Sequence, residues 1–169
     1  MTDTENTWDK LLQIKTTGRD DSHADQYHHP YEPTPYCVLE RLANKGFIGK
    51  RDVVLDYGCG KGRVDFFLSY QTKAGTIGIE YDKRIYQSAV QNQKTAVSRA
   101  RVELVPANAE TYAVPAEVNR CYFFNPFFRG TPAQSDRKNQ RILLRESARN
   151  PIVFLLSGRC IYFLSHDGR

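Results

Sequence analysis

The sequence lacks long apolar runs and contains few sulfur-bearing residues. Its 169 residues include four cysteines and one methionine. No stretch approaches the roughly 18 consecutive apolar residues that a membrane-spanning helix needs. The polar start Met1–Glu5 carries no basic region followed by an apolar stretch. We therefore expect a cytoplasmic protein that has no membrane partner.

The sequence also has no recognisable metal-binding pattern. No two cysteines have the C-x-x-C spacing of a zinc or redox site. Three histidines near the start have no cysteine or acidic partner at a ligand spacing. We therefore expect reduced thiols and no metal; the residues concerned are Cys37, Cys59, Cys121, Cys160, His23, His28 and His29.

The composition is that of one ordinary globular domain, with 40% hydrophobic and 25% charged residues. Residues 1–35 are polar and rich in proline and histidine, which favours an extended or turn-rich arm, and the pattern allows a short amphipathic helix at its start. Residues 36–169 form the expected domain. A net charge of +5 is compatible with a nucleic-acid partner but does not require one.

Strand and helix patterns alternate from residue 36 onward. Such alternation predicts an α/β fold with a mainly parallel sheet and helices on both faces. The expected strands are 53–56, 76–80, 101–105, 120–124 and 151–156. The expected helices are one from Tyr36 that stops near Gly46, then 64–70, 83–98 and 135–149.

A glycine-rich turn follows the first expected strand, in the order Asp56-Tyr-Gly58-Cys-Gly60-Lys-Gly62. Glycine allows backbone angles closed to other residues and lets a ligand approach the main chain, so the turn predicts a ligand site. A Walker loop is excluded because no Ser or Thr follows the Gly-Lys pair. A dinucleotide fingerprint is disfavoured because Arg63 stands where its last glycine belongs.

An acid followed by G-x-G-x-G resembles the first motif of class I S-adenosylmethionine-dependent methyltransferases. The resemblance runs from residue 36 to residue 156 and is sharpest over 53–62. It implies a three-layer Rossmann-like fold that binds S-adenosyl-L-methionine on Gly58, Gly60 and Gly62, with Asp56 facing the cationic end of the cofactor. A carboxylate suits that ligand, which has a sulfonium and no phosphate.

Further cofactor contacts are expected after the second and third strands. Glu80 ends the second strand, where an acid can accept hydrogen bonds from both ribose hydroxyls; the alternative is a solvated acid. Tyr81 is its neighbour and a further candidate. Asn108 and Ala109 resemble the methyltransferase segment that reads the adenine edge, although a plain turn is nearly as good an explanation.

The acceptor side is expected at the end of the fourth strand. Asn125-Pro-Phe-Phe128 resembles the fourth motif of amino-methyltransferases, in which a side-chain oxygen and a backbone carbonyl face the target nitrogen. This resemblance implies catalytic roles for Asn125, Pro126 and Phe128. Phe127 departs from the motif's second proline and, with Phe128, is a candidate for lining the pocket.

Several features have two explanations. Tyr31 and Tyr36 are candidate cofactor-lid residues, because segments before the first helix often fold over the cofactor in class I methyltransferases. A basic stripe in the expected helix 135–149 fits a solvated face better than a nucleic-acid contact. It consists of Arg137, Arg141, Arg145 and Arg149.

Only residues 157–169 follow the fifth expected strand, enough for one short strand such as 160–164. The C-terminal hairpin usual in the family is therefore expected to be incomplete. The sheet edge that this leaves would make a homodimer reasonable.

The sequence thus predicts a methyltransferase whose acceptor is unknown, with nitrogen of a small molecule, protein or nucleic acid as the target. The alternative is a non-catalytic nucleoside-binding or RNA-binding module on the same fold.

Overall fold

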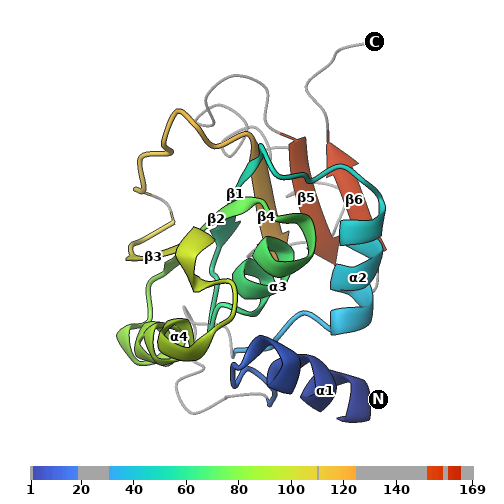
Figure 1. Ribbon diagram of the computed structural model, residues 1–169. Helices are drawn as coiled ribbons and strands as arrows, with labels where there is room; N and C mark the ends of the chain where they lie inside the picture. Colours follow the sequence, from blue (N-terminus) through green and yellow to red (C-terminus); the bar gives the residue numbers. More distant parts are fainter. Residues whose placement is uncertain (1, 19–30, 110, 125–151, 158–159, 165–169) are drawn as a thin grey trace.

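The computed structural model describes residues 2–18, 31–109, 111–124, 152–157 and 160–164. Helices and strands alternate along most of this length (Figure 1). The helices are α1 (Thr2–Leu12), α2 (Tyr36–Asn44), α3 (Arg63–Thr72), α4 (Lys83–Thr95) and the 3-10 turn η1 (Arg99–Arg101). The strands are β1 (Val53–Tyr57), β2 (Gly75–Glu80), β3 (Val102–Pro106), β4 (Arg120–Phe124), β5 (Ile152–Ser157) and β6 (Cys160–Leu164).

The six strands form one sheet in the order β3-β2-β1-β4-β5-β6. The first five are parallel and β6 is antiparallel to β5. The chain builds outward from β1 to β3 and then returns to the other side of β1 with β4. The carboxyl ends of β1 and β4 therefore mark the topological switch point, where open α/β sheets bind ligands. The expected α/β, Rossmann-like fold class with a mainly parallel sheet is confirmed.

Alternate residues of the central strands pack into two cores, one on each face of the sheet. On one face Val54 and Tyr122 pack under α1, α2 and α3. On the other face Leu55 and Phe123 pack against the segment that joins β3 to β4. The described helices that enter these cores are on the first face; the expected helix 135–149 lies outside the described residues.

Two local signals set the bounds of α4. Asp82 caps its start, because the Asp82 side chain accepts hydrogen bonds from the backbone N–H groups of Arg84 and Ile85. The helix ends at Thr95, three residues earlier than the pattern predicts. Ala96 turns into an extended conformation and is fully buried, and the Ser98 hydroxyl donates to the carbonyl of Phe66. Tertiary packing therefore ends this helix.

Residues 2–17 begin with the helix that the sequence allows at the start of the arm and are packed, not extended. They form α1 and a short segment that packs on α2 and α3, with Leu12 fully buried and Ile14 nearly so. Several polar residues of this stretch are partly buried, because they surround and bind the side chain of Arg63.

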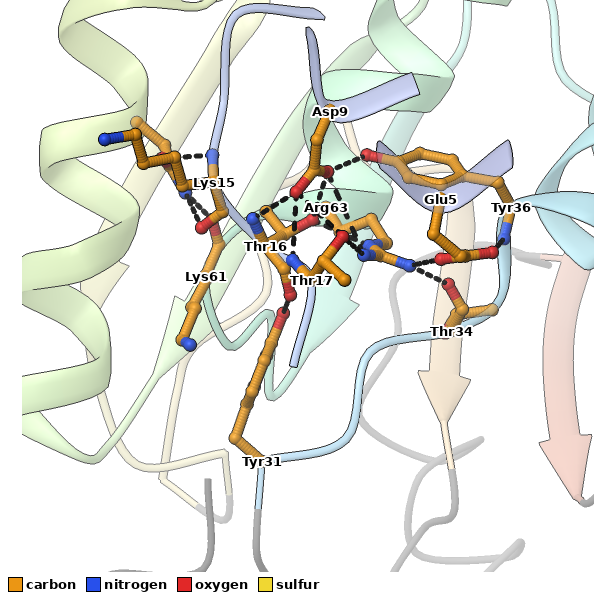
Figure 2. A network of polar contacts seen from close by, with 11 residues as sticks. Glu5, Asp9, Lys15, Thr16, Thr17, Tyr31, Thr34, Tyr36, Lys61 and Arg63 are labelled. Atoms are coloured by element: carbon orange, nitrogen blue, oxygen red, sulfur yellow. Dashed lines mark hydrogen bonds and ion pairs between the residues drawn. The ribbon is translucent and has the colours of Figure 1, made fainter. Parts of the chain in front are cut away.

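Figure 2 shows the polar network that attaches this segment to the start of α3. Arg63, 2% exposed, pairs with Glu5 and also donates to the hydroxyls of Thr16 and Thr17. Its guanidinium lies over the ring of Tyr36, 4.3 Å from the ring centroid. A buried cation is stable only where it is paired and hydrogen-bonded, and these contacts meet that need.

Asp9 is the second buried charge of the network. Its carboxylate lies 3.8 Å from the Arg63 guanidinium and accepts hydrogen bonds from Thr16, Thr17 and the Tyr36 hydroxyl. Burial acts to raise the pKa of Asp9, but these hydrogen bonds outweigh it and the net pKa is lowered. Asp9 is therefore ionised in the folded protein at neutral pH.

We expect Asp9→Ala to lower the free energy of unfolding by about 3 kcal/mol, because the substitution removes one partner of a buried pair. The contribution of Asp9 should be present above its ordinary pKa of 3.8 and be lost as the pH falls through the lowered value. Urea denaturation measures both effects. Asp3→Ala on the exposed side of the same helix is the control and should cost roughly 0.5 kcal/mol. Equal costs for the two variants would contradict a buried network.

Candidate functional site

The glycine-rich turn joins β1 to α3 at the switch point. Gly58, Gly60 and Gly62 have φ values of +77°, +59° and +82°, in the left-handed region that favours glycine. The N–H groups of Gly58 and Cys59 both donate to the carbonyl of Ile79, at 2.9 Å each. These bonds hold the turn against the carboxyl end of β2.

Tyr31 lies directly on this turn. A Cβ atom added at Gly60 would be 2.5 Å from the Tyr31 ring, and the Nζ atom of Lys61 lies 4.6 Å from the centre of that ring. The Tyr31 hydroxyl donates to the carbonyl of Thr16 at 2.8 Å, so the ring is anchored to the packed N-terminal segment. This placement is compatible with a lid; the lid function stays a prediction.

Glu80 connects the turn to the start of α4. Its Oε2 accepts from the Gly60 N–H at 3.0 Å and its Oε1 accepts from the Asp82 N–H at 2.8 Å. Burial raises the pKa of Glu80, and these hydrogen bonds act in the opposite direction. Each carboxylate oxygen can still accept a further hydrogen bond. Tyr81, which follows, has 63% of its surface exposed.

Asp56 is buried below the turn, together with an acid that the sequence reasoning missed. Asp56 lies on β1 and Asp65 in the first turn of α3, and they are 2% and 0% exposed. Within the described residues, Oδ2 of Asp56 and both carboxyl oxygens of Asp65 lack a hydrogen-bond partner. The signal for Asp65 in the sequence was an isolated acid in the apolar stretch Val64–Leu68.

The segment after β3 passes beside Glu80. The Ala107 N–H donates to the Glu80 carbonyl at 3.1 Å, and the Thr111 N–H donates to the Asn108 carbonyl at 3.1 Å, which makes a turn. Ala109 packs against the second core. The structure therefore brings Asp56, the three glycines, Glu80 and Asn108 together at the carboxyl ends of three adjacent strands.

Other predicted site residues are not brought to this point. Tyr36 is fully buried between α1 and α3, where it packs against Trp8 and Phe67 and donates to Asp9, so it lacks the exposure that a lid contact requires. The predicted catalytic residues Asn125, Pro126 and Phe128, together with Phe127, lie outside the described residues. Where the structure describes the chain, it contains no group of three or more side chains arranged to hold a metal ion.

Substitutions in the turn should separate backbone strain from packing. Gly58→Ala should lower the free energy of unfolding by about 1 to 2 kcal/mol, because a Cβ there meets nothing within 4 Å and only the left-handed conformation is penalised. Gly60→Ala should cost about 2 to 5 kcal/mol, because its Cβ also meets the Tyr31 ring. Denaturant titration of both variants measures the difference; equal costs would show that Tyr31 does not press on the turn.

Comparison with known proteins supports the fold and links it to one class of enzyme. No family model matches the chain. Over 84 residues it is 32% identical to a protein-lysine N-methyltransferase of Saccharolobus islandicus, a match that covers 48% of this chain and 51% of that protein. The chain therefore spans about half the length of this relative.

Two solved structures with S-adenosyl-L-homocysteine bound have similar folds. An RNA methyltransferase from Salinibacter ruber has a TM-score of 0.62 at 23% identity, covering 73% of this chain and 76% of that one. An S-adenosylmethionine-dependent methyltransferase from Thiobacillus denitrificans has a TM-score of 0.61 at 16% identity, covering 76% and 51%. In the described part of the chain, no helix has both the length and the apolar content of a membrane span. By comparison with these two structures, the chain has the Rossmann-like fold of class I S-adenosylmethionine-dependent methyltransferases.

Proposed function

We propose that this protein binds S-adenosyl-L-methionine and transfers its methyl group to a nitrogen atom. The observation that carries the proposal is the hydrogen bond of 3.0 Å between the Gly60 N–H and Glu80. It joins the glycine-rich turn to the acid at the end of the neighbouring strand, so that one ligand can contact both. The fold and the methyltransferase relative support this assignment.

The residues present fit the charge of this cofactor. The left-handed turn brings bare backbone to the switch point, and Glu80 keeps acceptor capacity for ribose hydroxyls. The unpartnered oxygen of Asp56 lies under the turn, where it would favour a cation. We assign the adenine end to Asn108, Ala109 and Tyr81.

A dinucleotide fits the same residues poorly. The acids Asp56 and Glu80 would repel a pyrophosphate. Arg63, which follows the turn, is engaged by Glu5, Asp9 and the threonines of the N-terminal segment, so it does not offset this repulsion. The ammonium group of Lys61, within the turn, lies over the Tyr31 ring. The charge of the site therefore favours a ligand that carries a sulfonium and an amino group.

The cofactor supplies an activated methyl group, so the protein has to hold the acceptor lone pair in line and leave a route for the proton. We propose that the side-chain oxygen of Asn125 and the carbonyl of Pro126 orient the acceptor nitrogen, with Phe128 against the acceptor. Nitrogen as the target is supported by the name of the protein-lysine N-methyltransferase relative. Transfer of labelled methyl to components of a cell extract identifies the acceptor, and binding without transfer would favour a non-catalytic module.

We expect calorimetry to detect binding of S-adenosylmethionine and S-adenosylhomocysteine and to detect no binding of NAD. The physical reason is the acidic character of the site, which attracts the cationic amino group of both sulfur nucleosides and the sulfonium of S-adenosylmethionine, and repels a pyrophosphate. All three titrations use the same protein at the same pH and salt concentration. Tight binding of NAD with no response to either sulfur nucleoside would overturn the cofactor assignment.

Glu80→Ala should weaken cofactor binding by about 1.5 to 3 kcal/mol, the usual scale for losing hydrogen bonds to a charged group. Glu103→Ala is the matched control, because Glu103 is an exposed acid on the adjacent strand β3 and should leave affinity unchanged. Circular dichroism confirms that both variants are folded before titration. An unchanged dissociation constant for folded Glu80→Ala would show that Glu80 does not contact the ribose.

A further inference from the structure

The buried acids Asp56 and Asp65 form a pair from two different elements. Asp56 projects from β1 toward the face that carries α3, and Asp65 lies in the first turn of that helix. Their carboxyl groups are close enough to share a hydrogen bond, which requires that one of them carries a proton. Such a bond uses one oxygen of each acid, so at least one of the three unpartnered oxygens stays available.

Gly78 makes room for this pair. Gly78 is the β2 residue in register with Asp56. A Cβ atom added there would lie 2.7 Å from Oδ2 of Asp65 and 2.8 Å from the Cβ atom of Cys59. No side chain other than hydrogen fits between these atoms. The Asp65 carboxyl group therefore lies against the backbone of Gly78, beside Asp56.

The surroundings of the pair disfavour two negative charges. Burial raises the pKa of Asp56 to about 7, the hydrogen bond with Asp65 acts to lower it, and the charge of Glu80 acts to raise it. Burial and then the charge of Asp56 raise the pKa of Asp65 well above its ordinary range. Other titratable groups face the pair from the turn, β4 and the segment before α2; they are Cys59, Tyr122 and Tyr31.

We propose that Asp65 is a positioning residue that shares a proton with Asp56 and so fixes the orientation and charge of the carboxylate beneath the cofactor. The proposal rests on the function proposed above. Asp65 keeps its proton and donates it to Asp56, whose remaining acceptor capacity is available to the cationic end of the cofactor. When the cofactor binds to the doubly protonated pair, Asp56 releases its proton to solvent.

This arrangement makes cofactor affinity depend on pH. As the pH falls below about 7, Asp56 becomes protonated and affinity should fall by up to about tenfold per pH unit. Asp65→Asn keeps a neutral hydrogen-bond donor of similar shape next to Asp56 and should keep the parent dependence on pH. Asp65→Ala removes the donor that acts to lower the pKa of Asp56, so that pKa should rise and the fall in affinity should begin at higher pH.

Calorimetry with S-adenosylhomocysteine from about pH 5.5 to about pH 8, in buffers of different ionisation enthalpy, tests the proposal. We expect the parent and Asp65→Asn to lose affinity and release protons on binding below about pH 7, and Asp65→Ala to show both effects from a higher pH. Glu103→Gln, which removes an exposed acid from β3, should keep the parent profile. Identical profiles for parent and Asp65→Ala would overturn the role of Asp65.

An infrared measurement on the parent protein needs no cofactor and no variant. The carbonyl stretch of a protonated carboxyl group should persist at about pH 8, where exposed carboxyl groups are ionised. Its absence would overturn the shared proton. If the parent binds neither sulfur nucleoside at any pH, the proposed function fails and the positioning role fails with it. A pH-independent affinity in a parent that does bind overturns this inference alone.

Discussion

The burial of the Arg63 guanidinium is the constraint on which the rest of the structure depends. A charge that is 2% exposed needs ligands from elsewhere in the chain, and here the N-terminal segment supplies them from Glu5, Asp9 and Thr16. The same segment anchors Tyr31, which lies on Gly60. Through Gly60 the turn is bonded to Glu80. One buried cation thus connects the start of the chain to the acids of the proposed cofactor site.

The parts of the fold that sequence predicts are those governed by neighbouring residues. The strands around Leu55 and Cys121 are found where expected, because alternating or continuous apolar runs are local patterns. The left-handed turn was predicted because glycine alone favours that backbone. Asp82 caps α4 where the pattern predicts its start, whereas the early end at Thr95 depends on the burial of Ala96 in a core that the helix pattern does not show.

The features that sequence did not predict depend on residues distant in the chain. The role of Asp65 depends on its position beside Asp56 and against Gly78. Gly78 lies on β2, the strand that follows α3 in the chain. The polar composition of residues 2–17 indicated an exposed arm. The partner of these polar side chains is Arg63, which is too distant in the sequence for a local pattern to reveal. Tyr36, a lid candidate by sequence position, is instead held in the core by Trp8 and Asp9. The acceptor-side residues from Asn125 lie outside the described part of the chain.

The packing of α1 against the rest of the domain can also be compared with the binding of a ligand that is covalently attached to its receptor. Because α1 is covalently attached, its encounter with Arg63 is intramolecular, which raises its effective concentration. Contacts of modest intrinsic affinity are then enough to keep it in place. The ionic and hydrogen-bonded contacts with Arg63 fix direction as well as proximity, and the apolar contacts of Trp8 and Leu12 add buried surface. The first helix thus acts as a tethered cap that is oriented by the geometry of one guanidinium group.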